Sequence, residues 1–174
     1  MMDVQIVRGF KEMESEFGYI YIGVYASDLS KCKIGKSTIG PFTRFIQKTN
    51  APDYMPFRAY KIPLSDLHKL EQYLHKKLAF HSQRILHTYT GSESEWFSCH
   101  PLEAADIIEY LIPNCLDIET NEYGFELRGI VIYPPYHENI FSYWREEHVP
   151  FLKLFVDDFG RVLPQPTFRP WKEI

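Results

Sequence analysis

Residues 18–44 read GYIYIGVYASDLSKCKIGKSTIGPFTR, and this stretch decides the fold. Its first part, YIYIGVYA, is rich in β-branched and aromatic residues and predicts a strand. The segment SDLSK predicts a turn and KCKIG a second strand, so residues 18–36 should form a hairpin. Gly40 and Pro41 then open a predicted helix that runs to about Thr49, because proline fits the first helical position.

The next segments continue an alternation of strands and helices. We predict a loop over residues 50–56 and a strand over residues 57–64 that ends near Pro63. A helix is predicted over residues 66–81, because its leucines repeat at the spacing of a core-facing stripe and Ser65 is a suitable N-cap.

The last segments of this unit are shorter. Residues 84–94 are predicted to be irregular, residues 95–99 to form a short strand, and Pro101 to open a helix that stops before Pro113. The order β-β-α-β-α-β-α predicts an α/β (α+β) domain over residues 17–113. We expect a three- to four-stranded, mainly antiparallel sheet flanked by helices.

The two ends of the chain differ from this domain. Residues 1–16 are a polar, acidic N-terminal lead-in, and residues 114–174 are an acidic C-terminal extension rich in aromatic residues and proline. Within the extension, residues 124–133 predict a strand. Its role is open, and we expect that it mediates homodimerisation or binds a protein partner.

Charge is distributed unevenly along the chain. The whole chain has a net charge of −4, but residues 17–113 carry +2 and residues 114–174 carry −4. Residues 31–48 hold five cations and no acid, which predicts a short basic face suited to nucleic acid. No stretch approaches the ~20 apolar residues of a membrane helix, so we expect a soluble, cytoplasmic protein without a membrane partner.

Glu71 stands out on the helix predicted over residues 66–81. It lies on the same stripe as Leu67, Leu70, Leu74 and Leu78. An unpaired carboxylate on a buried stripe would cost several kcal/mol, so Glu71 needs a cation or strong hydrogen-bond donors. Either it pairs with a Lys or Arg at the edge of the stripe, or it binds a divalent metal in a cleft beside the core.

Three features together resemble the GIY-YIG nuclease superfamily, and in particular its phage-type branch. They are the paired tyrosines Tyr19 and Tyr21, the KIG tripeptide at residues 33–35, and Arg44 on the helix that follows. The EWF tripeptide at residues 95–97 strengthens the resemblance, which covers about residues 17–112. Lys33 stands where the second signature of the superfamily usually begins with tyrosine. The branch suggests a phage or bacterial intracellular origin.

The resemblance implies roles for five residues. Glu71 is the position that matches the metal ligand of the superfamily, and Tyr21 matches the active-site tyrosine, with Tyr19 as the alternative in a shifted register. Lys33 would hold a phosphate oxygen or help Tyr21 lose its proton, since a phenol ordinarily keeps it up to pH ~10. Arg44 would bind the scissile phosphate through its planar guanidinium.

Four further residues are additional candidates. His68 and His75 flank Glu71 at spacings of three and four residues, which places them on one side of the helix as possible metal ligands or simply as polar residues bordering it. Glu95 either closes the active site or only accompanies Trp96 in the core. Lys36 belongs to the predicted basic face.

The resemblance therefore implies an endonuclease that depends on Mg²⁺ or Mn²⁺ and hydrolyses phosphodiester bonds, with DNA as the expected substrate. The asparagine that many members of the superfamily carry late in the domain has no counterpart here. The alternative is a non-catalytic module that retains the fold and binds nucleic acid or protein.

Overall fold

The computed structural model describes residues 17–39, 53–116, 130–135, 137 and 140. The described chain forms six strands and two helices: β1 Phe17–Tyr25, β2 Asp28–Ser37, β3 Tyr54–Pro63, α1 Leu64–His81, β4 Arg84–Leu86, β5 Glu93–Phe97, α2 Pro101–Leu116 and β6 Val131–Tyr133. The predicted helix opened by Pro41 lies outside the described residues. Neither described helix is long and apolar enough to cross a membrane.

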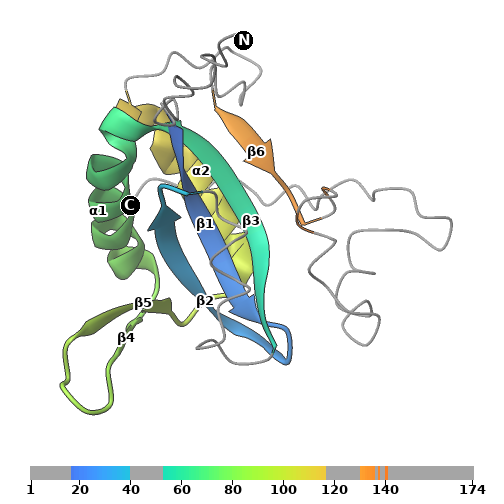
Figure 1. Cartoon of the computed structure of the whole chain (residues 1–174). Helices are drawn as coiled ribbons and strands as arrows, with labels where there is room; N and C mark the ends of the chain where they lie inside the picture. Colours follow the sequence, from blue (N-terminus) through green and yellow to red (C-terminus); the bar gives the residue numbers. More distant parts are fainter. Residues whose placement is uncertain (1–16, 40–52, 117–129, 136, 138–139, 141–174) are drawn as a thin grey trace, which may run out of the picture.

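The strands form one antiparallel sheet in the order β4-β5-β2-β1-β3-β6 (Figure 1). The predicted hairpin of β1 and β2 is confirmed, as is the α+β class. The predicted count of three to four strands was wrong for the described chain, because β4 and β6 add a short strand at each edge. β6 comes from the predicted C-terminal extension and pairs with β3.

Both helices cover the same face of the sheet (Figure 1). A Cβ on Gly18 of β1 would collide with Leu67 of α1, so this residue faces α1. Ile20 has the same orientation two residues on, and its β3 partner Tyr60 reaches Glu109 of α2. The core therefore lies between this face and the helices. It includes the fully buried side chains Ile20, Ile22, Ile34, Ile62, Leu67, Leu70, Leu74, Leu78 and Ile108.

Strand β3 begins earlier than predicted. Tyr54 and Pro56 belong to the strand, although residues 50–56 were expected to be a loop. Pro56 is accommodated because the register between β1 and β3 shifts between Ile22 and Gly23, so that Phe57 is skipped in the pairing. A proline has no N–H to give to the ladder, and such an irregularity is where a strand tolerates it.

The helix boundaries also differ from prediction. Helix α1 begins at Leu64 with Pro63 at its N-cap, and no side chain caps it, so Ser65 lies inside the first turn. Helix α2 continues through Pro113 to Leu116. Its burial continues too, since Pro113 and Cys115 are both buried, and packing of this apolar side outweighs the backbone hydrogen bond that a proline removes.

A polar network joins β3 to α2 inside the helix-covered face. Arg58 donates to Glu109 at 2.7 Å, and the hydroxyl of Tyr60 donates to the same oxygen at 3.1 Å. Asp106 lies beside this network, and its buried Oδ2 accepts no hydrogen bond from the described part of the chain. Burial, followed by the nearby charge of Glu109, raises the pKa of Asp106 to about 6.

Replacing Asp106 with asparagine should stabilise the protein at neutral and alkaline pH. Because the pKa of Asp106 is higher in the folded protein, the protonated acid favours the folded state. Its contribution to the free energy of unfolding is complete below the ordinary pKa of 3.8 and is lost as pH rises through about 6. The free energy of unfolding from urea titrations at about pH 4, 6 and 8 should therefore fall less in Asp106→Asn than in the wild type. Identical pH profiles of the two proteins would contradict a raised pKa at Asp106.

Candidate active site

The ring of Tyr21 lies across β2 at Gly35. The two residues are direct cross-strand partners, and a Cβ on Gly35 would lie 2.5 Å from both Cζ and the hydroxyl oxygen of Tyr21. Only glycine leaves room for the ring at this position. The KIG glycine therefore lets the Tyr21 hydroxyl reach the backbone of β2.

Tyr54 of β3 repeats this arrangement one strand away. Its hydroxyl end lies over Gly23 of β1, where a Cβ would collide with it. Burial, and then the neighbouring Tyr21, raise the pKa of Tyr54. Tyr54 was not predicted as a site residue, because residues 50–56 were expected to form a loop. Its position three residues before a predicted strand was the available signal.

Lys33 shares the face of Tyr21 and Gly35, the face opposite to the helices. Alternation along β2 gives Lys33 and Gly35 the same orientation, and Lys33 forms an ion pair with Glu95 of β5 at 2.9 Å. Next to Glu95, Trp96 is half-buried and stacks on Tyr25, with ring centroids 4.7 Å apart. The structure thus joins two of the predicted site residues, Lys33 and Glu95, and holds the lysine ammonium in a defined place.

Glu71 lies on the helix side of the sheet and is 7% exposed. Its Oε2 accepts a hydrogen bond from Lys36 of β2 at 2.5 Å. The register of β1 and β2 explains this contact, because Lys36 pairs with Ile20, whose side chain faces the helices. The expectation that a buried Glu71 needs a cation is confirmed, and Lys36 supplies it.

His68 completes this cluster. The ammonium of Lys36 is 2.6 Å from Nδ1 of His68, and the same nitrogen is 3.9 Å from Glu71. A lysine only donates, so Nδ1 of His68 accepts and its proton is on Nε2. We call Lys36, His68 and Glu71 the acid–lysine cluster.

His75 lies one helical turn beyond Glu71 and is engaged through both ring nitrogens. Its Nε2 donates to the carbonyl oxygen of Ile34 at 2.8 Å, and its Nδ1 is 3.3 Å from the guanidinium of Arg84. His75 therefore links β2 to the β4–β5 hairpin. In this arrangement His75 holds neighbouring elements in place, and neither ring nitrogen is available to bind a metal together with Glu71.

The outer edge of β2 lies between the two groups of side chains. Strand β5 pairs with β2 only at Cys32 and Lys33, so residues 34–37 have no outer strand partner in the described chain. Tyr21 approaches this edge across Gly35 from one face, and the acid–lysine cluster lies on the other. Tyr19 shares the face of Tyr21 but lies beside Tyr133 of β6, with ring centroids 6.3 Å apart.

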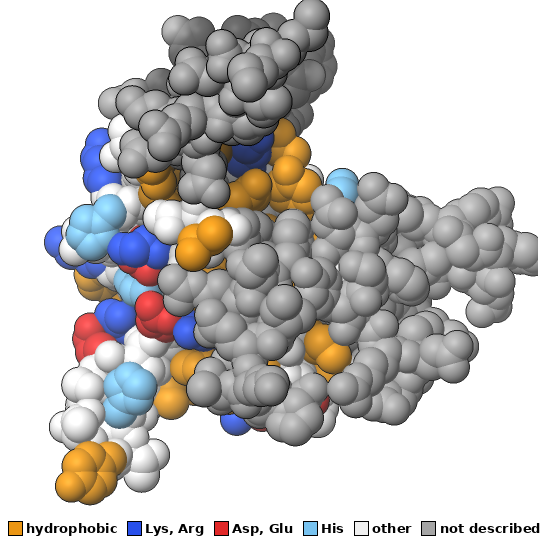
Figure 2. Space-filling model, in the orientation of Figure 1, with side chains coloured by type: hydrophobic (Ala, Val, Ile, Leu, Met, Phe, Trp, Pro, Cys, Tyr) orange, Lys and Arg blue, Asp and Glu red, His pale blue; other side chains and the backbone are white. Residues whose placement is uncertain are grey.

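Charged groups of both signs gather on this flank of the molecule. Figure 2 shows lysine or arginine, acidic and histidine side chains interleaved on the flank above the projecting hairpin. Arg44, the predicted phosphate-binding residue, lies outside the described residues.

A search for similar proteins identifies the domain. The T5orf172 domain matches residues 18–112, which is more than half of the chain. The chain belongs to the T5orf172 domain family. This family is associated with nucleases and DNA-binding proteins. No curated protein and no solved structure matches the chain.

The T5orf172 match spans the structural unit that carries the site. It begins within β1 and ends within α2, so it includes Tyr21, Gly35, the acid–lysine cluster and the β4–β5 hairpin. β6 lies beyond the match, although it pairs with the T5orf172 sheet through β3.

Proposed function

We propose that this T5orf172 protein is a divalent-metal-dependent endonuclease that hydrolyses phosphodiester bonds in DNA. The observation that supports it best is the buried Glu71 carboxylate, held by Lys36 beside the part of β2 that has no outer strand partner within the described residues. Burying a carboxylate that is held by a partly exposed lysine costs free energy, and such polar sites are frequent in active centres.

Glu71 suits a hydrated Mg²⁺ or Mn²⁺. Within the described residues no group of three acidic, histidine or cysteine side chains forms a closed metal site. Mg²⁺ is commonly bound by only one or two carboxylates and keeps several waters or takes phosphate oxygens. Bound there, the ion would polarise the phosphate and stabilise the leaving oxygen. Lys36, which is one-third exposed, would turn from Glu71 to the substrate.

The remaining residues would act on phosphate and water. Lys33, held by Glu95, would bind a phosphate oxygen on the face of Tyr21. The Tyr21 hydroxyl, placed on β2 by Gly35, would orient the attacking water and accept its proton with the help of Lys33. We propose that Arg44 stabilises the charge that develops on the phosphate.

The test is cleavage of supercoiled plasmid by the full chain. Nicking is expected with Mg²⁺ or Mn²⁺, and EDTA should abolish it, because one bound ion supplies charge stabilisation that no described side chain replaces. Agarose gels follow the conversion from supercoiled to open-circular plasmid. A folded protein that binds DNA equally with metal and with EDTA, and never nicks it, would instead favour a non-catalytic binding module.

A further inference from the structure

The β4–β5 hairpin projects from the body of the domain beyond the end of α1 (Figures 1 and 2). Its tip is ordered by backbone hydrogen bonds. The N–H of His87 donates to Ser92 at 2.8 Å, and the N–H of Gly91 donates to His87 at the same distance. Gly91 has a φ of 66°, which suits glycine at a tight turn. The hairpin therefore presents its tip in a defined conformation.

Tyr89 at this tip is 100% exposed. Two other large apolar side chains are exposed at the same end of the molecule, Phe80 of α1 at 77% and Leu86 of β4 at 54%. One exposed large apolar side chain needs no explanation, but two aromatic rings and a leucine at one end of the molecule form a surface that the folded core does not use.

Positive charge near this surface comes from α1. Lys76 and Lys77 precede Phe80 by about one helical turn, whereas Arg84 of the hairpin is neutralised by its ion pair with Glu93. Flanking residues such as Thr88 and Thr90 at the tip are polar and uncharged. Positive charge combined with exposed aromatic rings is the chemistry of single-stranded nucleic-acid binding.

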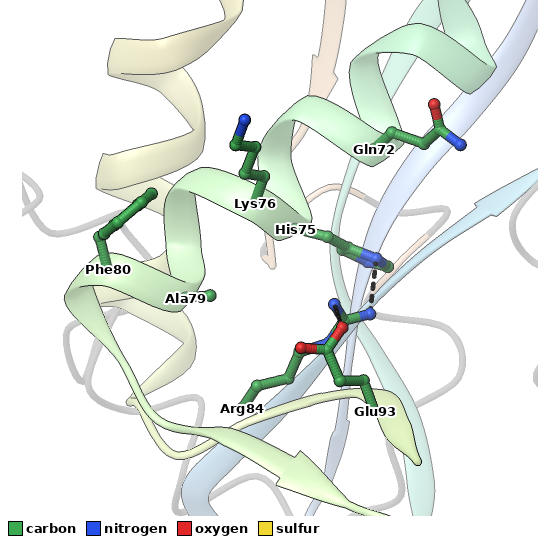
Figure 3. Close-up of a pocket in the computed structure, with 7 residues that line it drawn as sticks. All are labelled: Gln72, His75, Lys76, Ala79, Phe80, Arg84 and Glu93. Carbon is green, nitrogen blue, oxygen red and sulfur yellow. Dashed lines mark hydrogen bonds and ion pairs between the residues drawn. The ribbon is translucent and has the colours of Figure 1, made fainter.

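A pocket of about 490 Å³ lies between α1 and the foot of the hairpin. Gln72, His75, Lys76, Ala79, Phe80, Arg84 and Glu93 line it. Figure 3 shows Arg84 and Glu93 rising together from the hairpin toward His75. Arg84 is held by Glu93 at 2.6 Å and by the carbonyl oxygen of Ser94 at 2.6 Å, so its guanidinium is fixed at the pocket.

This pocket is connected to the candidate active site. His75 contacts Arg84 on one side and the carbonyl oxygen of Ile34, at the open edge of β2, on the other. A nucleic-acid strand that leaves the β2 edge along α1 would meet Lys76 and then the hairpin.

We infer that the β4–β5 hairpin is a second nucleic-acid contact, in which Tyr89 stacks on an unpaired base and Lys76 faces a neighbouring phosphate. This inference rests on the proposed function and adds a substrate class to it, namely DNA with a single-stranded segment beside the cleaved bond. Stacking is tolerant of sequence because every base has a π-face, so the contact selects strand structure and not sequence.

The test uses the full chain in EDTA with a single-stranded oligonucleotide that carries 2-aminopurine. Binding by the wild type should quench the fluorescence of the analogue as it stacks. Tyr89→Ala should weaken binding by about tenfold and remove most of the quenching, because stacking on one aromatic ring accounts for an affinity loss of this order. Tyr89→Phe should retain both, since the ring does the stacking.

Tyr110→Ala is the matched control, because Tyr110 is also an exposed tyrosine, at 49%, but lies on α2. The inference is wrong if Tyr89→Ala binds and quenches like Tyr110→Ala. Plasmid nicking separates this from the proposed function. Nicking by the wild type without any effect of Tyr89→Ala on binding would overturn the hairpin contact alone. Tyr89-dependent binding without nicking would support the contact and count against the nuclease.

Discussion

Replacing Glu71 with glutamine is expected to lower metal-dependent cleavage by about 1000-fold while the protein remains folded. The substitution keeps the size of the side chain but removes the charge that would bind the metal, and loss of one strong stabilising group at a reacting centre has effects of this size. Plasmid nicking under single-turnover conditions measures the effect. Raising the Mn²⁺ concentration should restore part of the rate if the defect is in metal binding.

The folded state should tolerate Glu71→Gln because Lys36 is one-third exposed and can turn toward water. We expect a loss of about 1–2 kcal/mol in the free energy of unfolding, the usual range for a hydrogen bond to a charged group. Asp66→Asn is the control, since it also removes one carboxylate from α1, in the first turn, where Asp66 is only partly buried. Cleavage by Glu71→Gln at the rate of Asp66→Asn would remove Glu71 from the site.

Replacing Gly35 with alanine is expected to cause the second large effect. The added Cβ would lie 2.5 Å from the Tyr21 ring, so the ring must move or β2 must shift. Overpacking of this kind costs about 1–3 kcal/mol of stability. Cleavage should fall by about 100-fold, because a displacement of about 1 Å in a catalytic group can cost that much. Urea unfolding and plasmid nicking measure the two quantities.

A double-mutant cycle separates the clash from other consequences of the substitution. In a Tyr21→Leu background the ring is absent, so Gly35→Ala should cost much less stability than in the wild type. An equal cost in both backgrounds would show that the strain lies in the β2 backbone. If Gly35→Ala changes neither stability nor cleavage, the placement of Tyr21 over Gly35 is wrong.

Features that depend on residues close together in sequence were predicted correctly, and those that depend on distant residues or on very short segments were not. The β1–β2 hairpin and the leucine stripe of α1 follow from residues close together in sequence, and both are confirmed. The strand β4 was missed because three residues are too few to show a periodic pattern. The start of α1 was misplaced because Ser65 is a good local cap, whereas β3 runs directly into the helix through Pro63.

The amino-acid sequence by itself determined the β1–β2 hairpin, the buried stripe of α1 and the need of Glu71 for a partner, since these depend on spacing along one strand or helix. Only the tertiary structure decided which partner it was. Lys36 meets Glu71 across 35 residues because the β1–β2 register turns Lys36 toward α1. The same register places Tyr21 on Gly35, and the earlier start of β3 brings Tyr54 beside it. Such meetings depend on strand register and helix packing, which no local pattern specifies.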